Sequence, residues 1–344
     1  MDRVVYLLGA GFSAPLGLPV MSNFLLKSKD LFASDPTRYG HFSEVFDKIR
    51  DMSVAKNYYA TDLFNIEEIL SILEMNSFLE GGKPKNLFTK YISDVIQYFT
   101  PAMKPVPGAP SNWQDVMFGT EVPWRGYGYF PLNLCNLVLK QEPSGLACFR
   151  NGQPTAQYSV ITLNYDMVLE NVIQFVRERA MMAGELGFGG PKRKQEMTLL
   201  AKLHGSADGG IIVPPTWNKG THPEIVPVWG EAKKALREAN HIRVIGYSLP
   251  TADTYIRYPF KSAVLDSPNL KSIDVLSKDP DGATRRRYDD FVTFNYYRFV
   301  KADVLEYLEH FQSRSMSSLH PEWYDRLEDS HETFFDKTTT GTSA

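Results

Sequence analysis

Residues 4–8 (VVYLL) form a short run of aliphatic and β-branched side chains that leads directly into residues 9–14 (GAGFSA). A continuous apolar run of this length is typical of a strand buried on both faces of a parallel sheet. Gly9, Gly11 and Ala14 match the dinucleotide pattern G-x-G-x-x-G/A, in which glycines allow the backbone to approach a pyrophosphate at a helix N-terminus. The chain is therefore expected to open with the first βα unit of a nucleotide-binding sheet. A glycine turn that only packs a helix on the sheet is the alternative.

A dehydrogenase would add a second strand that ends in Asp or Glu about 20 residues after the glycines. Asp30 stands at that distance, but the surrounding residues 25–31 (LLKSKDL) have a helical pattern. This absence of a second strand weakens the dehydrogenase interpretation.

Strand patterns return in the second half of the chain, at residues 158–163, 199–203, 210–213, 242–246, 272–276 and 292–294. Helical patterns at 167–182 and 231–239 separate several of them, and a last helix is expected at 304–311. Strands that alternate with helices imply right-handed crossovers. We therefore predict an α/β fold: a Rossmann-like, largely parallel sheet with helices on both faces.

Between the two groups of strands the pattern is helical. Residues 43–79 place Ile66, Ile69, Leu70 and Leu73 on one helix face, and residues 90–99 continue this spacing. The stretch 101–131 is rich in proline and aromatic residues, which favours an irregular connection. We predict a mainly helical insertion at about 40–154 in a domain of residues 1–310, whose core comprises about 1–39 and 155–310. Residues 311–344 are predicted to be a C-terminal segment with a disordered polar tail.

Composition narrows the function classes. With 43% hydrophobic and 22% charged residues the chain is globular, and no apolar run approaches the roughly 18 residues that cross a bilayer. No secretory signal precedes the first strand, so a cytoplasmic location is expected. A net charge of −3 gives no broad attraction to nucleic acid. The two cysteines, Cys135 and Cys148, cannot supply the four thiolates of a structural zinc site.

Polar residues follow the predicted strands at the edge where open α/β sheets bind ligands. Asn164 carries both donors and acceptors and can hold a ribose hydroxyl or a water, and His204 is a natural general base. Gly246 and Ser248 end a further strand. Two plainer interpretations stay open: Asn164 and Asp166 could only cap the next helix, and His204 could be structural.

Taken in order, GAGFS at 9–13, GLP at 17–19, TLNYD at 162–166, HG at 204–205 and GYSL at 246–249 resemble the sirtuin-like (SIR2-like) superfamily. The resemblance covers residues 1–20 and about 155–300. It implies that these motifs surround NAD, with Asn164 and His204 as the catalytic pair. The cofactor-binding residues that it implies are Gly9, Ala10, Gly11, Ser13, Asp166, Gly246 and Ser248.

The departures from that family are also informative. Its protein deacylases carry a four-cysteine zinc ribbon between the histidine and the G-x-S loop, whereas this chain has no cysteine after Cys148. We therefore expect no metal, and in particular no zinc. NIEE at 65–68 and VPPTWNK at 213–219 resemble instead the bacterial sirtuin-like proteins of anti-phage defence, which hydrolyse NAD and often act with a partner such as a HerA-like ATPase.

The resemblance thus implies an NAD⁺ glycohydrolase, an NADase of anti-phage immunity. A zinc-independent deacylase or ADP-ribosyltransferase is one alternative, and a nucleotide-sensing assembly module without turnover is another. A homo-oligomer gated by a HerA-like ATPase is also expected, because an unrestrained cytosolic NADase would deplete the cell's own cofactor. Residues 113–129 and 320–324 are the candidate contact surfaces, although both could pack on their own subunit.

Overall fold

A computed structural model describes residues 1–52, 66, 68–69, 71–72, 75, 86–104, 118, 124–152, 154–208, 211–213, 223–251, 253–265, 267–315 and 326–340. Its centre is a seven-stranded sheet in the order β10-β9-β8-β1-β4-β7-β6, in which all neighbouring strands are parallel. The strands are β1 (Asp2–Leu8), β4 (Ala156–Thr162), β6 (Phe188–Gly189), β7 (Thr198–Lys202), β8 (His241–Ile245), β9 (Ser272–Ser277) and β10 (Tyr297–Lys301). The predicted Rossmann-like parallel sheet is confirmed.

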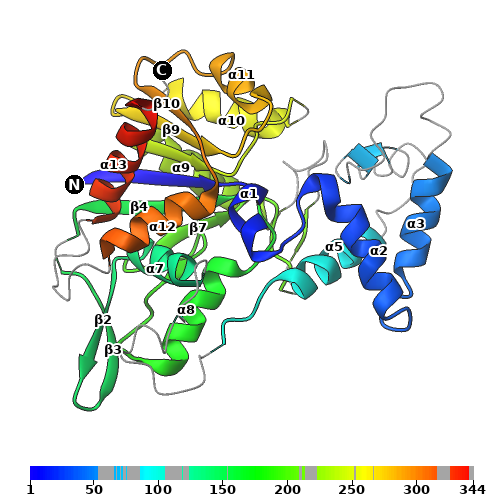
Figure 1. Ribbon diagram of the computed structural model, residues 1–344, viewed down its shortest axis with the longest axis horizontal. Helices are drawn as coiled ribbons and strands as arrows, with labels where there is room; N and C mark the ends of the chain where they lie inside the picture. Colours follow the sequence, from blue (N-terminus) through cyan, green and yellow to red (C-terminus); the bar gives the residue numbers. More distant parts are fainter. Residues whose placement is uncertain are drawn as a thin grey trace.

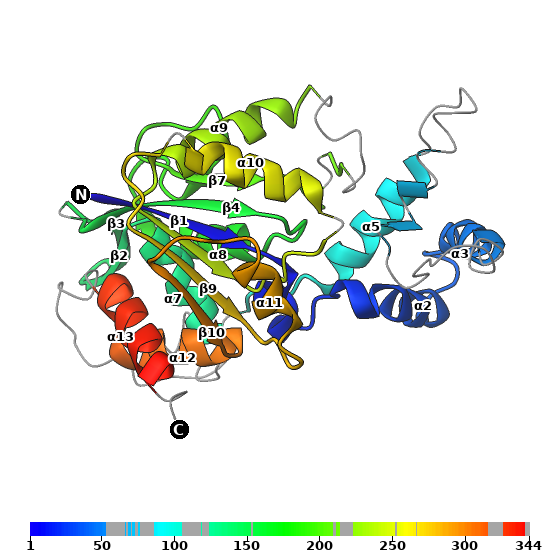
Figure 2. The same cartoon turned by 90° about the horizontal axis from the view of Figure 1, so that it is seen from above.

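Helices cover both faces of this sheet (Figure 2). Because successive side chains of a strand point to opposite faces, Tyr6 and Leu8 enter one core while Val5 and Leu7 enter the other. The first core is completed by α7 (Trp124–Leu134), α8 (Val168–Arg179), α12 (Val304–Ser315) and α13 (Arg326–Thr340). The second is completed by α9 (Val226–Glu238), α10 (Thr254–Leu265) and α11 (Ala283–Asp289).

A helical lobe lies beyond the carboxyl edge of the sheet (Figures 1 and 2). It contains α2 (Phe24–Ser34), α3 (Phe42–Asp51) and α5 (Asn86–Phe99), and it is joined to β1 through α1 (Ala10–Ser13) and the 3-10 turns at Ala14–Leu16 and Met21–Asn23. Phe42 and Tyr91 are fully buried in the core of the lobe, together with Ile66 and Ile69. Asn65, Leu70 and Leu73 lie outside the described residues. No described helix is long and apolar enough to cross a membrane.

The region predicted as a helical insertion, about 40–154, is only partly helical. β2 (Leu137–Glu142) and β3 (Gly145–Arg150) form an antiparallel hairpin, to which β5 (Met181–Met182) adds a short parallel strand. The stretch 101–131, expected to be irregular, ends inside α7. Tyr127, Phe130 and Leu134 are fully buried at helical spacing, and this burial outweighs the helix-breaking tendency of Pro131.

The expectation that residues 113–129 form a contact surface for a partner is therefore wrong for the part of this stretch in α7. Tyr127 and Tyr129, at 0% and 2% exposure, pack into the core of their own subunit. Residues 113–117 and 320–324, including Trp113 and His320, lie outside the described residues.

Three further expectations differ from the structure. Of the strand expected at 210–213, the described residues 211–213 make a single bridge, from Ile212 to Gly205, and Gly210 lies outside the described residues. The edge strand is β10, Tyr297–Lys301, not residues 292–294, because the later segment pairs with β9. Within the C-terminal segment, Arg326–Thr340 form α13, whose apolar residues Leu327 and Phe335 are buried, and residues 316–325 and 341–344 lie outside the described part.

Buried charges hold α13 against the sheet. Arg243 of β8 is 1% exposed, and its two terminal nitrogens each lie 2.7 Å from a carboxylate oxygen of Glu328 on α13. Arg298 of β10 donates to both oxygens of Asp274 on β9, at 2.7 and 3.0 Å. His331 of α13 places Nε2 3.2 Å from Asp274 Oδ2. The three strands on this side of the sheet are thus tied to one helix, β8 and β10 by the ion pairs Arg243–Glu328 and Arg298–Glu332 and β9 by the Asp274–His331 hydrogen bond.

Candidate functional site

The turn after β1 packs directly on the turn after β8. The amide of Gly9 donates to the carbonyl of Ile245 at 3.0 Å, and that of Gly11 donates to the carbonyl of Gly246 at 2.8 Å. A Cβ atom at Gly9 or Gly11 would lie 2.7 or 2.8 Å from the Gly246 oxygen, so neither position has room for a side chain. These contacts fit the alternative in which the glycines serve the packing of the turn. A role for Gly9 and Gly11 in binding a pyrophosphate stays a prediction.

The helix that follows the glycines is only one turn long. α1 covers Ala10–Ser13 and passes into a 3-10 turn, which ends at Gly17 with φ of +89°. Ala10 is exposed, whereas Ser13 is buried. The hydroxyl of Tyr127 on α7 donates to the carbonyl of Phe12, which fixes this short turn on the first core.

Asn164 follows β4 and joins it to the glycine turn. Its side-chain amide donates to the carbonyl of Gly9 at 3.0 Å and lies 3.3 Å from the hydroxyl oxygen of Ser13. Its backbone amide donates to Thr162 Oγ1 at 3.0 Å. The side chain therefore does not cap α8, and the capping interpretation is wrong for this residue.

Asp166 does cap α8, because its Oδ1 accepts the backbone N–H of Val168 at 3.1 Å. Burial raises the pKa of this carboxyl, and the charge of Lys202 and the hydroxyl of Ser13 oppose that rise. Ser13, Asn164 and Asp166 together line a small hollow of about 210 Å³, solvent at its mouth included. Its other lining residues are Leu8, Phe12, Thr162, Leu169 and Glu170.

His204 lies in a tight turn that follows β7. Its carbonyl accepts the amide of Val213 at 2.9 Å, and Gly205 has φ of +83° with the Ile211 oxygen where a Cβ would stand. Only glycine fits this turn. The His204 ring is 2% exposed and lies 5.8 Å, centroid to centroid, from the ring of Tyr165. His204 thus contacts the residue that follows Asn164.

The turn after β8 is held by α11. The hydroxyl of Tyr288 donates to the carbonyl of Tyr247 at 3.0 Å, and Arg287 Nε donates to the carbonyl of Ser248 at 2.9 Å. Gly246 has φ of +67° and lies against the glycine turn of β1, whereas Ser248 is exposed. The three consecutive arginines at 285–287 lie in α11, and one of them, Arg287, supports this turn.

The structure brings most of the predicted residues to one place, where β1 lies between β4 and β8. Gly9, Gly11, Ser13, Asn164, Asp166 and Gly246 are linked by the contacts above, and His204 joins them through Tyr165. Sequence reasoning missed Lys202 and Glu170, whose side chains form an ion pair beside the hollow at 2.9 Å. A lysine two residues before His204 and a glutamate one helical turn after Asp166 are the signals that could have found them.

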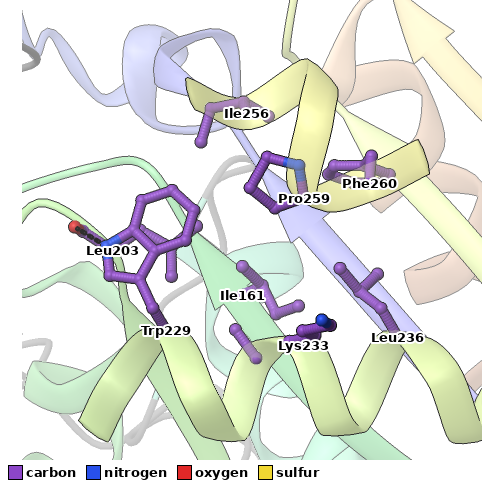
Figure 3. Close-up of a pocket in the computed structure, with 9 residues that line it drawn as sticks. Ile161, Leu203, Trp229, Lys233, Leu236, Ile256, Pro259 and Phe260 are labelled. Carbon is purple, nitrogen blue, oxygen red and sulfur yellow. Dashed lines mark hydrogen bonds between the residues drawn. The ribbon is translucent and has the colours of Figure 1, made fainter. Parts of the chain in front are cut away.

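A second hollow, of about 270 Å³, lies between α9 and α10 (Figure 3). Ile161 and Leu203 form its floor, and the indole N–H of Trp229 donates to the carbonyl of Leu203 at 3.2 Å. Its walls are almost entirely apolar, with Pro259 and Phe260 contributed by α10. It therefore lacks the convergent polar groups that orient a nucleotide.

No protein-family model and no curated protein sequence matches this chain. Among solved structures, Sir2Tm bound to a propionylated peptide is 14% identical with a TM-score of 0.36, covering 92% of this chain and 94% of that chain. Sir2 with a p53 peptide and NAD⁺ is 14% identical at a TM-score of 0.35, with the same coverage. A Sir2 homologue mutant in complex with ADP ribose is 11% identical at 0.37, covering 96% and 93%. Because every one of these TM-scores is below 0.5, the functional argument depends on the chain's own geometry.

Proposed function

We propose that this chain is a SIR2-like NAD⁺ glycohydrolase, and that Asn164 and His204 carry the reaction. The observation that supports it best is the contact of the Asn164 side chain with the glycine turn. β4 and β8 lie on opposite sides of β1, so the strand order reverses at β1, and the contact lies at the carboxyl end of this strand. Open α/β sheets bind nucleotides at such a point.

In the proposed reaction the bond between the nicotinamide nitrogen and ribose C1′ breaks, and its electron pair leaves with nicotinamide. Asn164 holds the ribose or the attacking water through its amide. Water then bonds to C1′ while His204 takes its proton, so the products are nicotinamide, ADP-ribose and a proton. A positioned base of this kind contributes roughly 10²- to 10⁴-fold in rate.

Binding of the whole dinucleotide requires the site to open. The hollow of about 210 Å³ is smaller than the roughly 300–1,000 Å³ of drug-sized ligand sites. The exposed Ala10 and Ser248 stand on the turns that follow β1 and β8, and these two turns are joined through Gly11 and Gly246. We expect them to move apart as NAD enters, with Gly9, Gly11 and Gly246 against the phosphates.

The cellular role that fits this activity is anti-phage immunity by depletion of NAD in the cytoplasm. We propose that the enzyme works as a homo-oligomer and that a HerA-like ATPase gates its activity. The helical lobe beside the carboxyl edge of the sheet is the element that such an assembly would move, since it is connected to the glycine turn through α1 (Figure 1).

Substitution of the two central residues tests the mechanism. Asn164→Ala and His204→Ala should each lower the rate of nicotinamide release by at least about 10²-fold, with melting temperature near that of wild type. His310→Ala, which removes a histidine of α12 that bonds Thr333 at 3.2 Å, should leave the rate unchanged. Full activity of either site variant would remove that residue from the mechanism. Assays with and without an acceptor peptide separate hydrolysis from deacylation and ADP-ribosyl transfer.

A further inference from the structure

Lys202 is the last residue of β7 and stands two residues before His204. Its side chain is 12% exposed. The ammonium nitrogen lies 2.5 Å from the carbonyl oxygen of Asp166, 2.9 Å from Glu170 Oε1 and 3.0 Å from Ser206 Oγ. Met167 Sδ lies 3.3 Å from the same nitrogen, and since an ammonium group has three protons, the three oxygen acceptors are sufficient to satisfy its donors.

The partners of Lys202 belong to two different loops. Asp166 and Glu170 lie in and after the loop that leaves β4, which also carries Asn164, whereas Ser206 lies in the turn that contains His204. β4 and β7 are neighbours in the sheet, with Thr162 opposite Lys202. One buried cation therefore bonds both of the loops that carry the proposed catalytic pair.

The same cation compensates two acids, the buried Asp166 and the partly exposed Glu170. Burial raises the pKa of Glu170, and the charge and hydrogen bond of Lys202 oppose that rise. The Asp166 carboxyl is affected in the same way. An arginine is a poor replacement here, because its planar fork cannot direct three donors to these acceptors as a compact ammonium does.

We propose that Lys202, paired with Glu170, is a positioning residue for the hydrolysis of NAD: it fixes the β4 and β7 loops relative to each other so that Asn164 and His204 act on the same ribose. This inference rests on the proposed function. Lys202 itself has no contact with the reacting atoms, because its donors are satisfied by protein acceptors.

The test removes both members of the ion pair. Lys202→Met keeps the length of the side chain, and Glu170→Gln in the same protein removes its carboxylate partner, so Asp166 is the one acid that loses the compensating charge of Lys202. The double variant should remain folded at the assay temperature while kcat falls about 10- to 100-fold and KM changes less, because displaced loops misplace the reacting groups. The matched control is Lys194→Met with Glu185→Gln, an exposed pair at 3.0 Å whose removal should leave kcat unchanged.

A second readout does not depend on turnover. In protein labelled with ¹³C-histidine, the His204 ring signal is identified by its loss in His204→Gln. This signal should shift in the Lys202→Met, Glu170→Gln protein and stay in place in the Lys194→Met, Glu185→Gln control. An unmoved signal together with wild-type kcat would overturn the positioning role. A wild-type protein that never hydrolyses NAD would overturn the proposed function instead, and the His204 signal would still decide whether Lys202 fixes the loops.

Discussion

Two regions of this molecule contain buried charged side chains, one beneath α13 and one at the carboxyl edge of the sheet. The pKa values of their carboxyl groups are shifted in opposite directions. Beneath α13, burial opposes ionisation, but His331 and Arg298 outweigh it and lower the pKa of Asp274. Arg243 has the same effect on Glu328. At the carboxyl edge, burial prevails and raises the pKa of Asp166 and Glu170.

The difference follows from the number of partners. Beneath α13, Glu328 and Asp274 each accept two hydrogen bonds from one guanidinium group. This arrangement fixes both groups and occupies the carboxylate oxygens that a ligand would otherwise contact. At the carboxyl edge, Lys202 alone provides a cation to Glu170, while Asp166 lines the hollow with Asn164. Shifted pKa values occur in structural networks as well as in active sites, so the shifts alone do not identify a functional site. The location at the carboxyl ends of the strands is what marks the second region as the candidate site.

Breaking the network beneath α13 should have the largest effect on stability. Glu328→Gln leaves the guanidinium of Arg243 buried, and Glu332, 3.9 Å away, is then the one acid paired with it among the described residues. We expect a loss of about 3 kcal/mol in the free energy of unfolding, measured by urea denaturation, with the rate per folded molecule unchanged. The control, Glu238→Gln, removes an exposed pair with Arg3 of the same 2.7 Å length and should cost less than about 1 kcal/mol. Equal losses in the two variants would contradict the comparison.

Acid should act on the same region through His331. Burial, with the nearby charge of Arg243, lowers the pKa of this histidine from 6.5 to about 4. Between these values the unfolded chain binds a proton that the folded protein does not, so stability falls as the pH drops from 6.5. The loss reaches about 2 to 3 kcal/mol near pH 4.5, before the carboxylates beneath α13 contribute.

The raised pKa values of Asp166 and Glu170 act with the opposite sign, because those folded-state carboxyls bind protons more readily than unfolded ones. The contribution of His331 is therefore measured as the difference between wild type and His331→Gln, unfolded by urea at pH 7, 6 and 5. A pH dependence that survives His331→Gln unchanged would refute the assignment.

Chelation is expected to have the smallest effect. In the part of the chain that the structure describes, Asp274, His331 and Glu332 bring potential ligand atoms within 4.8 Å of one another, but Arg298 bonds both acids. Treatment with a chelator should therefore change neither the melting temperature nor the NADase rate. Stoichiometric zinc by elemental analysis, together with unfolding on chelation, would be the opposing result.

The sheet could be predicted from sequence because its strands are continuous apolar runs, and the glycine turn because its residues are adjacent in the chain. The positions of Asn164 and His204 at strand ends followed from the same runs. α13 could not be predicted, because it is a mostly polar segment whose burial depends on Leu327, Phe335 and contacts with Arg243 and Asp274, which are 85 and 57 residues from their partners. Lys202 was missed for the same reason, because its partners Glu170 on α8 and Asp166 in the loop after β4 are 32 and 36 residues distant.

The helical lobe was only partly foreseen. Its spacing was recognised from about residue 43, but α2 already belongs to it, and α7 and the β2–β3 hairpin pack with the sheet instead. Periodicity identifies a helix face without saying which core that face enters. The buried face of α7, formed by Tyr127, Phe130 and Leu134, belongs to the first core.

The central claim is tested most directly by measuring nicotinamide and ADP-ribose released from NAD⁺ by the purified wild-type chain, alone and with a HerA-like ATPase titrated in, beside light scattering of the same samples. We expect both products in equal amounts without any acceptor peptide, from an oligomer whose rate changes with the ATPase, and loss of that release in His204→Ala. Absence of nicotinamide release under every condition, with NAD still bound, would contradict the glycohydrolase and leave a nucleotide-sensing module in its place.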